Sequence, residues 1–213
     1  MSRGLHRFAV LVACATFFLI IAGANVTSHD AGLAVPDWPL SFGKVFPRMV
    51  GNVFWEHGHR MIATAVGLLT IALAVYLQFR EPRAWVKRLG WIALAAVIAQ
   101  GLLGGLTVKL LLPLAVSAAH ATLAQLFFLI TVSLAVFTSP SWMSPPSPER
   151  SVENASLRPL SVLALAVILV QLVLGATLRH SATWDQNLPL AGGKSGDGPT
   201  HLAPERRIGC CGS

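Results

Sequence analysis

The apolar residues of this chain fall into five long blocks separated by polar stretches. The blocks cover residues 8–26, 58–79, 89–108, 113–137 and 160–178. Each is close to or above the roughly 20 residues that a helix needs to cross a bilayer. None alternates between apolar and polar positions, and all are too long for the strands of a membrane barrel. The pattern predicts an all-α integral membrane protein with five transmembrane helices.

Lysine and arginine are spread unevenly over the polar stretches. Eight lie in the N-terminal segment and in the second and fourth loops: Arg3, Arg7, Arg80, Arg83, Lys87, Arg88, Arg150 and Arg158. The first and third loops hold three: Lys44, Arg48 and Lys109. Because cytoplasmic loops are enriched in these residues, we expect a multi-pass protein of the inner (plasma) membrane with a cytoplasmic N-terminus.

The overall composition agrees with a membrane-embedded chain. Hydrophobic residues make up 54% and charged residues only 12%, whereas soluble domains carry about 25% charged residues. Part of the net charge of +7 is therefore a topology signal. The basic residues are scattered over loops and are not grouped with aromatic residues, so a nucleic-acid partner has no support.

The polar stretches divide the chain into a bundle, a linker and a tail. Residues 1–137 predict a four-helix transmembrane bundle, whose first outer loop is long, rich in Pro, Gly and aromatic residues, and expected to fold over the helix ends. The Pro- and Ser-rich residues 138–159 read as a cytoplasmic linker. Residues 160–178 predict the fifth helix. The polar, Gly-rich residues 179–213 are expected to be disordered.

The ends of the first and fifth helices resemble each other. "IIAGANVTSHDAGLAVPDWPL" and "LVLGATLRHSATWDQNLPL" both pass from apolar residues to Gly-Ala, and then to a His, Trp, Asp and Pro-Leu. Such a repeat is typical of membrane proteins built from duplicated halves. The fifth helix is then expected to begin a second bundle, which is incomplete because no further apolar block follows.

Chemistry-bearing residues gather where the second helix is expected to begin, in the segment "EHGHR". Glu56, His59 and Arg60 share one helix face, because residues three and four apart are neighbours. His57 points about 100° away and is expected to be an interfacial residue. Ionisable residues at the border of a membrane span usually face the bundle interior and mark function.

A second histidine, His120, is the only titratable residue of the fourth helix. His59 and His120 are expected at similar depth, because both helices run from outside to inside. Two inward histidines in a four-helix bundle are an arrangement that binds haem iron from one or both faces. A lone histidine that only hydrogen-bonds across helices is the alternative, whereas zinc would need further ligands. His29 and His180, at the ends of the first and fifth helices, are weaker candidates for contact with a cofactor.

The third helix ends in "QGLLGGLTV", where Gly101 and Gly105 would let another helix or a flat ring approach the backbone. Gln100 could donate a hydrogen bond within the bundle, but nothing in the sequence fixes its partner.

Four segments together resemble the N-terminal half of the haem A synthase family. They are "AGLAVPDWPLSFG" in the first outer loop, "EHGHRMIA" in the second helix, "QGLLGGLTV" in the third and "HATLAQLFF" in the fourth. The resemblance implies an oxidoreductase of cytochrome oxidase assembly with two tandem four-helix bundles. The enzyme converts the C8 methyl of haem O to the formyl of haem A through a hydroxylated intermediate.

Carried onto this chain, the resemblance implies roles for individual residues. His59 and His120 are the axial ligands of the haem iron, Glu56 is an acid/base or charge-stabilising catalytic group, and Arg60 pairs with a haem propionate. It further implies that the N-terminal bundle binds the haem being oxidised, that a second bundle holds haem b, and that His180 matches the histidine ending the fifth helix. Partners would be haem O and haem A, the lipid bilayer, and haem O synthase or cytochrome oxidase subunits.

Two departures from the family pattern leave a second function open. The first outer loop lacks the cysteine pair of some members, and the second bundle would need a second copy of the chain or another subunit to complete it. The alternative is a non-catalytic b-type haem subunit for electron transfer or assembly. A membrane scaffold without any cofactor is a third reading.

Overall fold

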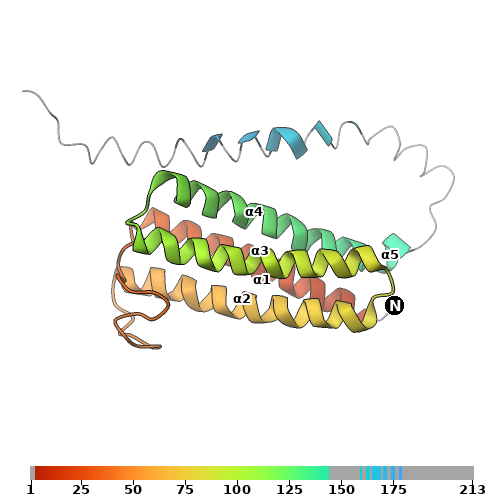
Figure 1. Cartoon of the computed structure of the whole chain (residues 1–213), viewed down its shortest axis with the longest axis horizontal. Coiled ribbons are helices and arrows are strands. Elements are labelled where there is room, and N and C mark those ends of the chain that lie inside the picture. Colours follow the sequence, from red (N-terminus) through yellow and green to blue (C-terminus); the bar gives the residue numbers. More distant parts are fainter. Residues whose placement is uncertain are drawn as a thin grey trace, which may run out of the picture.

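Four long helices make up nearly all of the regular structure in the computed structural model, which describes residues 3–143 and twelve separate positions between 159 and 178 (Figure 1). The helices are α1 (Arg3–Ser28), α2 (Asn52–Arg80), α3 (Ala84–Lys109) and α4 (Leu114–Phe137), and a short α5 (Pro140–Met143) follows. Within this part of the chain there is no strand, only an isolated bridge between Ser41 and Lys44. The predicted all-helical class is thus confirmed.

All four long helices are long and apolar enough to cross a membrane. The shortest has 24 residues, which corresponds to about 36 Å, against a bilayer core of about 30 Å. Large apolar side chains such as Phe18, Leu68 and Phe79 are exposed on the outside of the bundle, where lipid would cover them. The protein is therefore a membrane protein, as the composition predicted.

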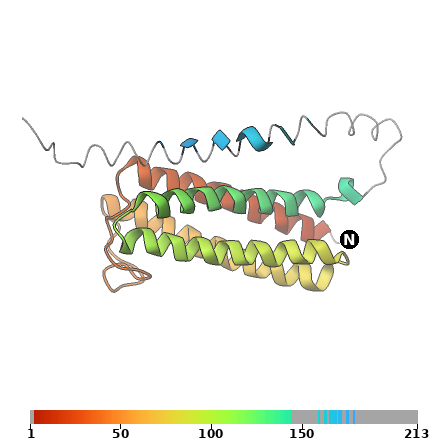
Figure 2. The same cartoon turned by 45° about the horizontal axis from the view of Figure 1, so that its top comes forward.

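The helices run alternately up and down and form a ring (Figures 1 and 2). Each packs against the two helices beside it, in the order α1, α2, α3, α4 and back to α1. The second and fourth helices therefore occupy diagonal positions. Residues 29–51 and the α3–α4 turn lie at the same end of the bundle, which we call the loop end (Figure 1).

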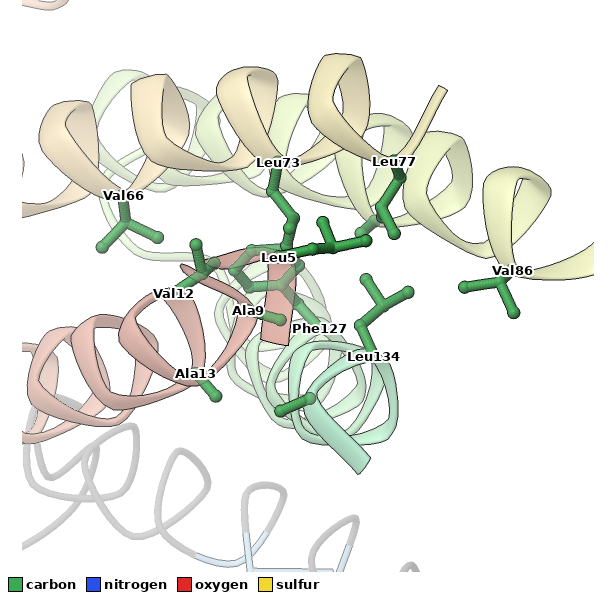
Figure 3. Packing of buried hydrophobic residues seen from close by; sticks show 12 residues of the cluster. Leu5, Ala9, Val12, Ala13, Val66, Leu73, Leu77, Val86, Phe127 and Leu134 are labelled. Carbon is green, nitrogen blue, oxygen red and sulfur yellow. The ribbon is translucent and has the colours of Figure 1, made fainter. Parts of the chain in front are cut away.

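The apolar core fills the half of the bundle away from the loop end (Figure 3). It is formed by the beginnings of α1 and α3 and the later turns of α2 and α4, with Leu5, Val12, Leu73, Leu77, Val86, Phe127 and Leu134 among its buried side chains. Tight packing here fixes the four helix axes. The half nearer the loop end holds His59, His120 and the glycines Gly23 and Gly104.

A buried ion pair closes the end opposite the loop. Glu81, which follows α2, accepts hydrogen bonds from Arg83, and Arg83 also donates to the Phe137 carbonyl oxygen at 2.7 Å. Burial raises the pKa of Glu81, but the hydrogen bonds and positive charge of Arg83 outweigh it and hold this pKa below its ordinary value. The contact ties the α2–α3 turn to the end of α4.

The predicted spans 8–26, 58–79, 89–108 and 113–137 all lie within or one residue beyond the observed helices. The main difference is α2, which begins six residues before the predicted start, so Glu56 lies in its second turn. Of the predicted fifth helix, residues 160–178, only separate positions are described, so it stays a prediction. The tail and most of the linker lie outside the described residues.

Candidate functional site

The two predicted histidines lie on diagonal helices in the half of the bundle nearer the loop end. Each ring packs against a glycine of a neighbouring helix. A Cβ built on Gly23 of α1 would lie 3.1 Å from His59 Cε1, and one built on Gly104 of α3 would lie 3.2 Å from His120 Cε1. The four helices thus contribute two imidazoles and the two glycines that make room for them.

Buried polar atoms without a partner gather around these rings. Among the described residues there are five: His57 Nε2, His59 Nδ1, Gln100 Oε1, Ser117 Oγ and His120 Nδ1. Such atoms are costly in an apolar surrounding, and native proteins leave few of them. All five lie in the half of the bundle nearer the loop end, which marks this region as a place for a polar or metal-bearing ligand.

Glu56 and Arg60 form a buried ion pair one helical turn apart in α2, as their spacing predicted. Glu56 is only 4% exposed. The Arg60 guanidinium donates to Glu56 Oε1, and the Val35 backbone N–H donates to Oε2 at 2.8 Å. Both carboxylate oxygens are therefore held, one by the helix and one by the loop.

The other contacts of Arg60 fasten the loop to α2. Its two terminal nitrogens donate to the backbone carbonyl oxygens of Asp37 at 2.8 Å, Leu40 at 3.1 Å and Val35 at 3.3 Å. The geometry thus adds a structural role to the propionate contact expected from the resemblance.

His57 lies near the loop end of α2 and is buried beneath the loop. It is 7% exposed, and its Nδ1 lies 2.8 Å from Ser41 Oγ in a buried hydrogen bond. The loop covers this side of α2. The spacing of residues along the helix gave no indication of this contact. Ser41 is itself fully buried.

Trp38 places the loop against α3 as well. A Cβ on Gly105 would lie 2.6 Å from the Trp38 ring, so only glycine permits this contact. The predicted close approach at Gly105 is real, but its partner is the loop. No atom outside its own helix lies within 4 Å of a Cβ on Gly101. The expectation that the loop folds over the helix ends is confirmed.

Asp37 shapes the tip of this loop. Its carboxylate accepts the backbone N–H groups of Phe42 and Gly43, each at 2.7 Å, and both of these residues have positive φ angles. The hydrogen bonds from Gly43 and Phe42 hold the pKa of Asp37 below its ordinary value of 3.8. The ionised carboxylate therefore stabilises a turn that residue types other than glycine rarely adopt.

Because the folded-state pKa is depressed, Asp37 stabilises the loop fully above its ordinary pKa. The contribution disappears as the pH falls through the folded-state pKa. We expect Asp37→Asn to lower the thermal unfolding midpoint at pH 7 and to leave it unchanged at the acid limit. Melting curves of the detergent-solubilised protein between pH 7 and pH 3 measure this, and a difference that is independent of pH would contradict the assignment.

Comparison with known proteins adds the decisive observation. Residues 48–195 match the model of the COX15-CtaA family, described as cytochrome oxidase assembly protein. The chain belongs to this family. The match includes Glu56, His59, Arg60 and His120, although it does not itself assign their roles.

Several curated proteins are similar in sequence to this member of the cytochrome oxidase assembly protein family. The chain is 31% identical over 184 residues to a heme A synthase of Symbiobacterium thermophilum, covering 84% of this chain and 60% of the relative. It is 35% identical over 107 residues to that of Shouchella clausii, covering 49% of this chain and 36% of the relative. A shorter match, 40% over 75 residues, reaches a protoheme IX farnesyltransferase of Haloarcula marismortui, with 35% of this chain and 16% of that protein covered.

These alignments cover only part of each relative. The chain spans between 36% and 60% of the length of the two heme A synthases. No solved structure matches it.

Two predicted residues remain, His29 and His180. His29 is exposed and stacks on Trp55, with ring centroids 4.1 Å apart, and its Nδ1 lies 2.9 Å from the Asn25 carbonyl oxygen. His180 falls outside the described residues. In the part of the chain that is described, no three His, Cys, Asp or Glu residues cluster as a metal site would require.

Sequence reasoning missed two further site residues, Ser41 and Ser117. Ser41 lies inside the loop segment that carries the family resemblance, whereas Ser117 lies in an apolar stretch with no motif of its own. Gln100 was noticed, and the structure now gives its partner, because Gln100 Nε2 donates to the His120 carbonyl oxygen at 2.8 Å. This contact joins α3 to α4 beside the second histidine.

Proposed function

We propose that this chain is a haem A synthase-type oxidoreductase that binds haem O in its four-helix bundle and oxidises the C8 methyl to a formyl group. The main support is the arrangement of His59 and His120, two half-buried imidazoles on diagonal helices, each with a buried Nδ1 that has no partner and a glycine at its side. Imidazole nitrogens are the usual haem ligands. Membership in the cytochrome oxidase assembly protein family and the similarity to heme A synthases support the substrate.

The residues present fit a haem. His59 and His120 would hold its iron, and Gly23 and Gly104 would let both rings stand between the helices. When bound, the haem supplies an iron centre at which its own substituent can be oxidised. The chain contributes orientation and exclusion of water, because the tryptophan-bearing loop packs on α3 and covers α2 at this end of the bundle.

Glu56 supplies a fixed carboxylate at the edge of this site. The Arg60 guanidinium and the Val35 N–H hold it in place. Glu56 would stabilise positive charge or take up a proton as the methyl group is oxidised. Arg60 would keep Glu56 oriented while it fastens the loop, with a propionate as a further acceptor.

The remaining assignments are proposals from the resemblance and the charge pattern. The bundle of residues 1–137 would lie in the inner membrane with a cytoplasmic N-terminus, followed by the linker 138–159. Residues 160–178 would cross as a fifth helix and begin a second bundle for haem b, with His180 at its end and with a second copy or another subunit completing it. Haem O synthase and cytochrome oxidase subunits would be partners in supply and delivery.

Conversion of haem O in living membranes tests the proposal. The wild-type chain, Glu56→Gln and the control Asp30→Asn, which changes an exposed acid of the loop, would each be produced in a host that makes haem O but no haem A. Chromatography of extracted haems should reveal haem A with the wild type and the control. Glu56→Gln should lower its yield by about a hundredfold or more, the usual effect of losing an acid/base group.

The alternative, a non-catalytic b-type haem subunit, predicts a different result. All three proteins would then carry haem and none would form haem A. The proposal would be overturned by haem-loaded wild-type membranes without haem A, or by Glu56→Gln membranes that form it at the wild-type rate.

A further inference from the structure

The later part of the first loop, residues 40–50, exposes a run of large apolar side chains. We call this segment the loop tip. Six of its residues are large, apolar and exposed: Leu40, Phe42, Val45, Phe46, Met49 and Val50. Phe46 is 74% exposed and Val50 is 72% exposed. An exposed apolar patch usually marks contact with a membrane or with another protein.

A strained turn presents one of these side chains. Phe42 has a φ of 54°, in the left-handed region that residues other than glycine rarely adopt. Two backbone hydrogen bonds between Ser41 and Lys44, each 3.0 Å long, close the turn. The Phe42 side chain is 52% exposed, so packing within the chain does not account for this backbone conformation. Strain of this kind is found mainly at functional positions.

The loop tip lies at the level of the membrane surface. Hydrogen bonds fasten the loop to the second and third turns of α2, at Glu56, His57 and Arg60. Arg60 is the last charged residue before the apolar run of this helix, so these turns lie where the hydrocarbon core begins. In Figures 1 and 2 residues 29–51 hang to one side of the bundle, remote from α4, and do not extend along the helix axes. The loop tip is therefore within reach of the lipid headgroups beside the bundle.

Two basic residues stand among the apolar side chains of the loop tip. Lys44 and Arg48 are both exposed. Neither takes part in the ion pairs of the described chain, which lie within α2 and at the α2–α3 turn. Segments that bind at a membrane surface combine aromatic and aliphatic side chains, which enter the headgroup boundary, with cations that meet anionic lipids. The composition and the level of the loop tip therefore favour a lipid surface over a protein partner.

We propose that the loop tip is a peripheral membrane anchor. Its apolar side chains enter the headgroup boundary of the leaflet at the loop end, and Lys44 and Arg48 bind the phosphates of anionic phospholipids. The anchor would hold the loop against the side of α2. It requires no haem, so it goes beyond the proposed function and does not depend on it. Docking of a protein partner on the same surface is the competing explanation.

Quenching of a fluorophore on the loop tip tests this proposal. The label would be attached to Val45→Cys, an exposed position, in the full chain with its three native cysteines changed to serine. Phosphatidylcholine nanodiscs would carry equal small fractions of nitroxide-labelled phosphatidylglycerol or nitroxide-labelled phosphatidylcholine. Both lipids should quench the label, and acrylamide in the water should quench it weakly. The phosphatidylglycerol should quench several-fold more strongly, because each basic residue near an anionic surface favours binding by a factor of about five.

Charge variants of the labelled chain identify the residues that select the lipid. Lys44→Gln combined with Arg48→Gln should make the two nitroxide lipids quench equally. The exchange of Lys44→Arg with Arg48→Lys keeps both charges and should retain the excess. Arg80→Gln combined with Arg88→Gln removes two exposed cations at the opposite end of the bundle and should leave the quenching at position 45 unchanged.

An apolar variant tests insertion separately from charge. Phe42→Ser combined with Phe46→Ser should reduce quenching by both lipids and increase quenching by acrylamide. Helical circular dichroism equal to that of the labelled parent would show that this variant is folded.

Two results would overturn the proposal. Strong quenching of the parent by acrylamide with none by either lipid would place the loop tip in water, where a protein partner could reach it. Equal quenching of the parent by both lipids would show that Lys44 and Arg48 do not select anionic lipid. Neither result bears on haem binding, so the proposed function would stand or fall by its own test.

Discussion

Replacing His120 with alanine is expected to abolish the low-spin haem spectrum of the purified protein, and His59→Ala to do the same or leave a high-spin, weakly held haem. Each imidazole would supply one axial bond, and either substitution removes a ligand that nothing nearby replaces. Among the described residues no other histidine lies with the pair in a cluster. Oxidised and reduced absorption spectra of equal amounts of protein, reconstituted with haem, provide the measurement.

His6→Ala serves as the matched control for this first prediction. His6 lies at the far end of the bundle, where its Nδ1 is 3.0 Å from the Ala135 carbonyl oxygen. Its replacement should leave the haem spectrum intact. An unchanged low-spin spectrum in both His59→Ala and His120→Ala would rule out the pair as ligands and restrict the two histidines to holding helices together.

Arg60→Met is expected to destabilise the folded protein by about 3 kcal/mol, because breaking a buried ion pair leaves an uncompensated charge. Glu56 would lose its charged partner and keep the Val35 N–H, and the loop would lose its carbonyl contacts with α2. Unfolding in increasing concentrations of SDS, followed by circular dichroism, measures the free energy of unfolding of both proteins.

A double variant separates the stranded charge from the lost loop contacts. Glu56→Gln combined with Arg60→Met carries no unpaired carboxylate, so it should be more stable than Arg60→Met alone. The difference in unfolding free energy that remains between the double variant and the wild type then measures the contribution of the contacts between Arg60 and the loop. If the two substitutions destabilise additively, the ion pair contributes no coupling energy and our account of this contact is wrong.

The helices and the histidine pair could be predicted because they follow from simple periodic rules. Apolar blocks of sufficient length give membrane helices, and residues three or four apart share a face, which placed Glu56 beside Arg60. The alternating direction of successive spans placed His59 and His120 near the same end. The fifth helix rests on the same reasoning and stays a prediction.

The contacts of the loop could not be predicted in this way. Arg60 binds backbone carbonyl oxygens, which every residue has, and only the path of an irregular chain brings those of Asp37 and Leu40 within its reach. The burial of His57 could not be predicted for the same reason, because nothing in a helical wheel indicates that a loop will cover it. Ser117 was missed because its distinguishing property, a buried hydroxyl without a hydrogen-bond partner, cannot be seen in the sequence.

The ring of helices also sets an order of events during biosynthesis. Each of the four spans contributes one residue to the pair of ring-and-glycine contacts: Gly23, His59, Gly104 and His120. A nascent chain that has inserted only three helices has one histidine of this pair, and the ring is still open beside it. Under the proposed function, a haem that needs both histidines would load only after the fourth span has entered the membrane, so cofactor capture would report that insertion is complete.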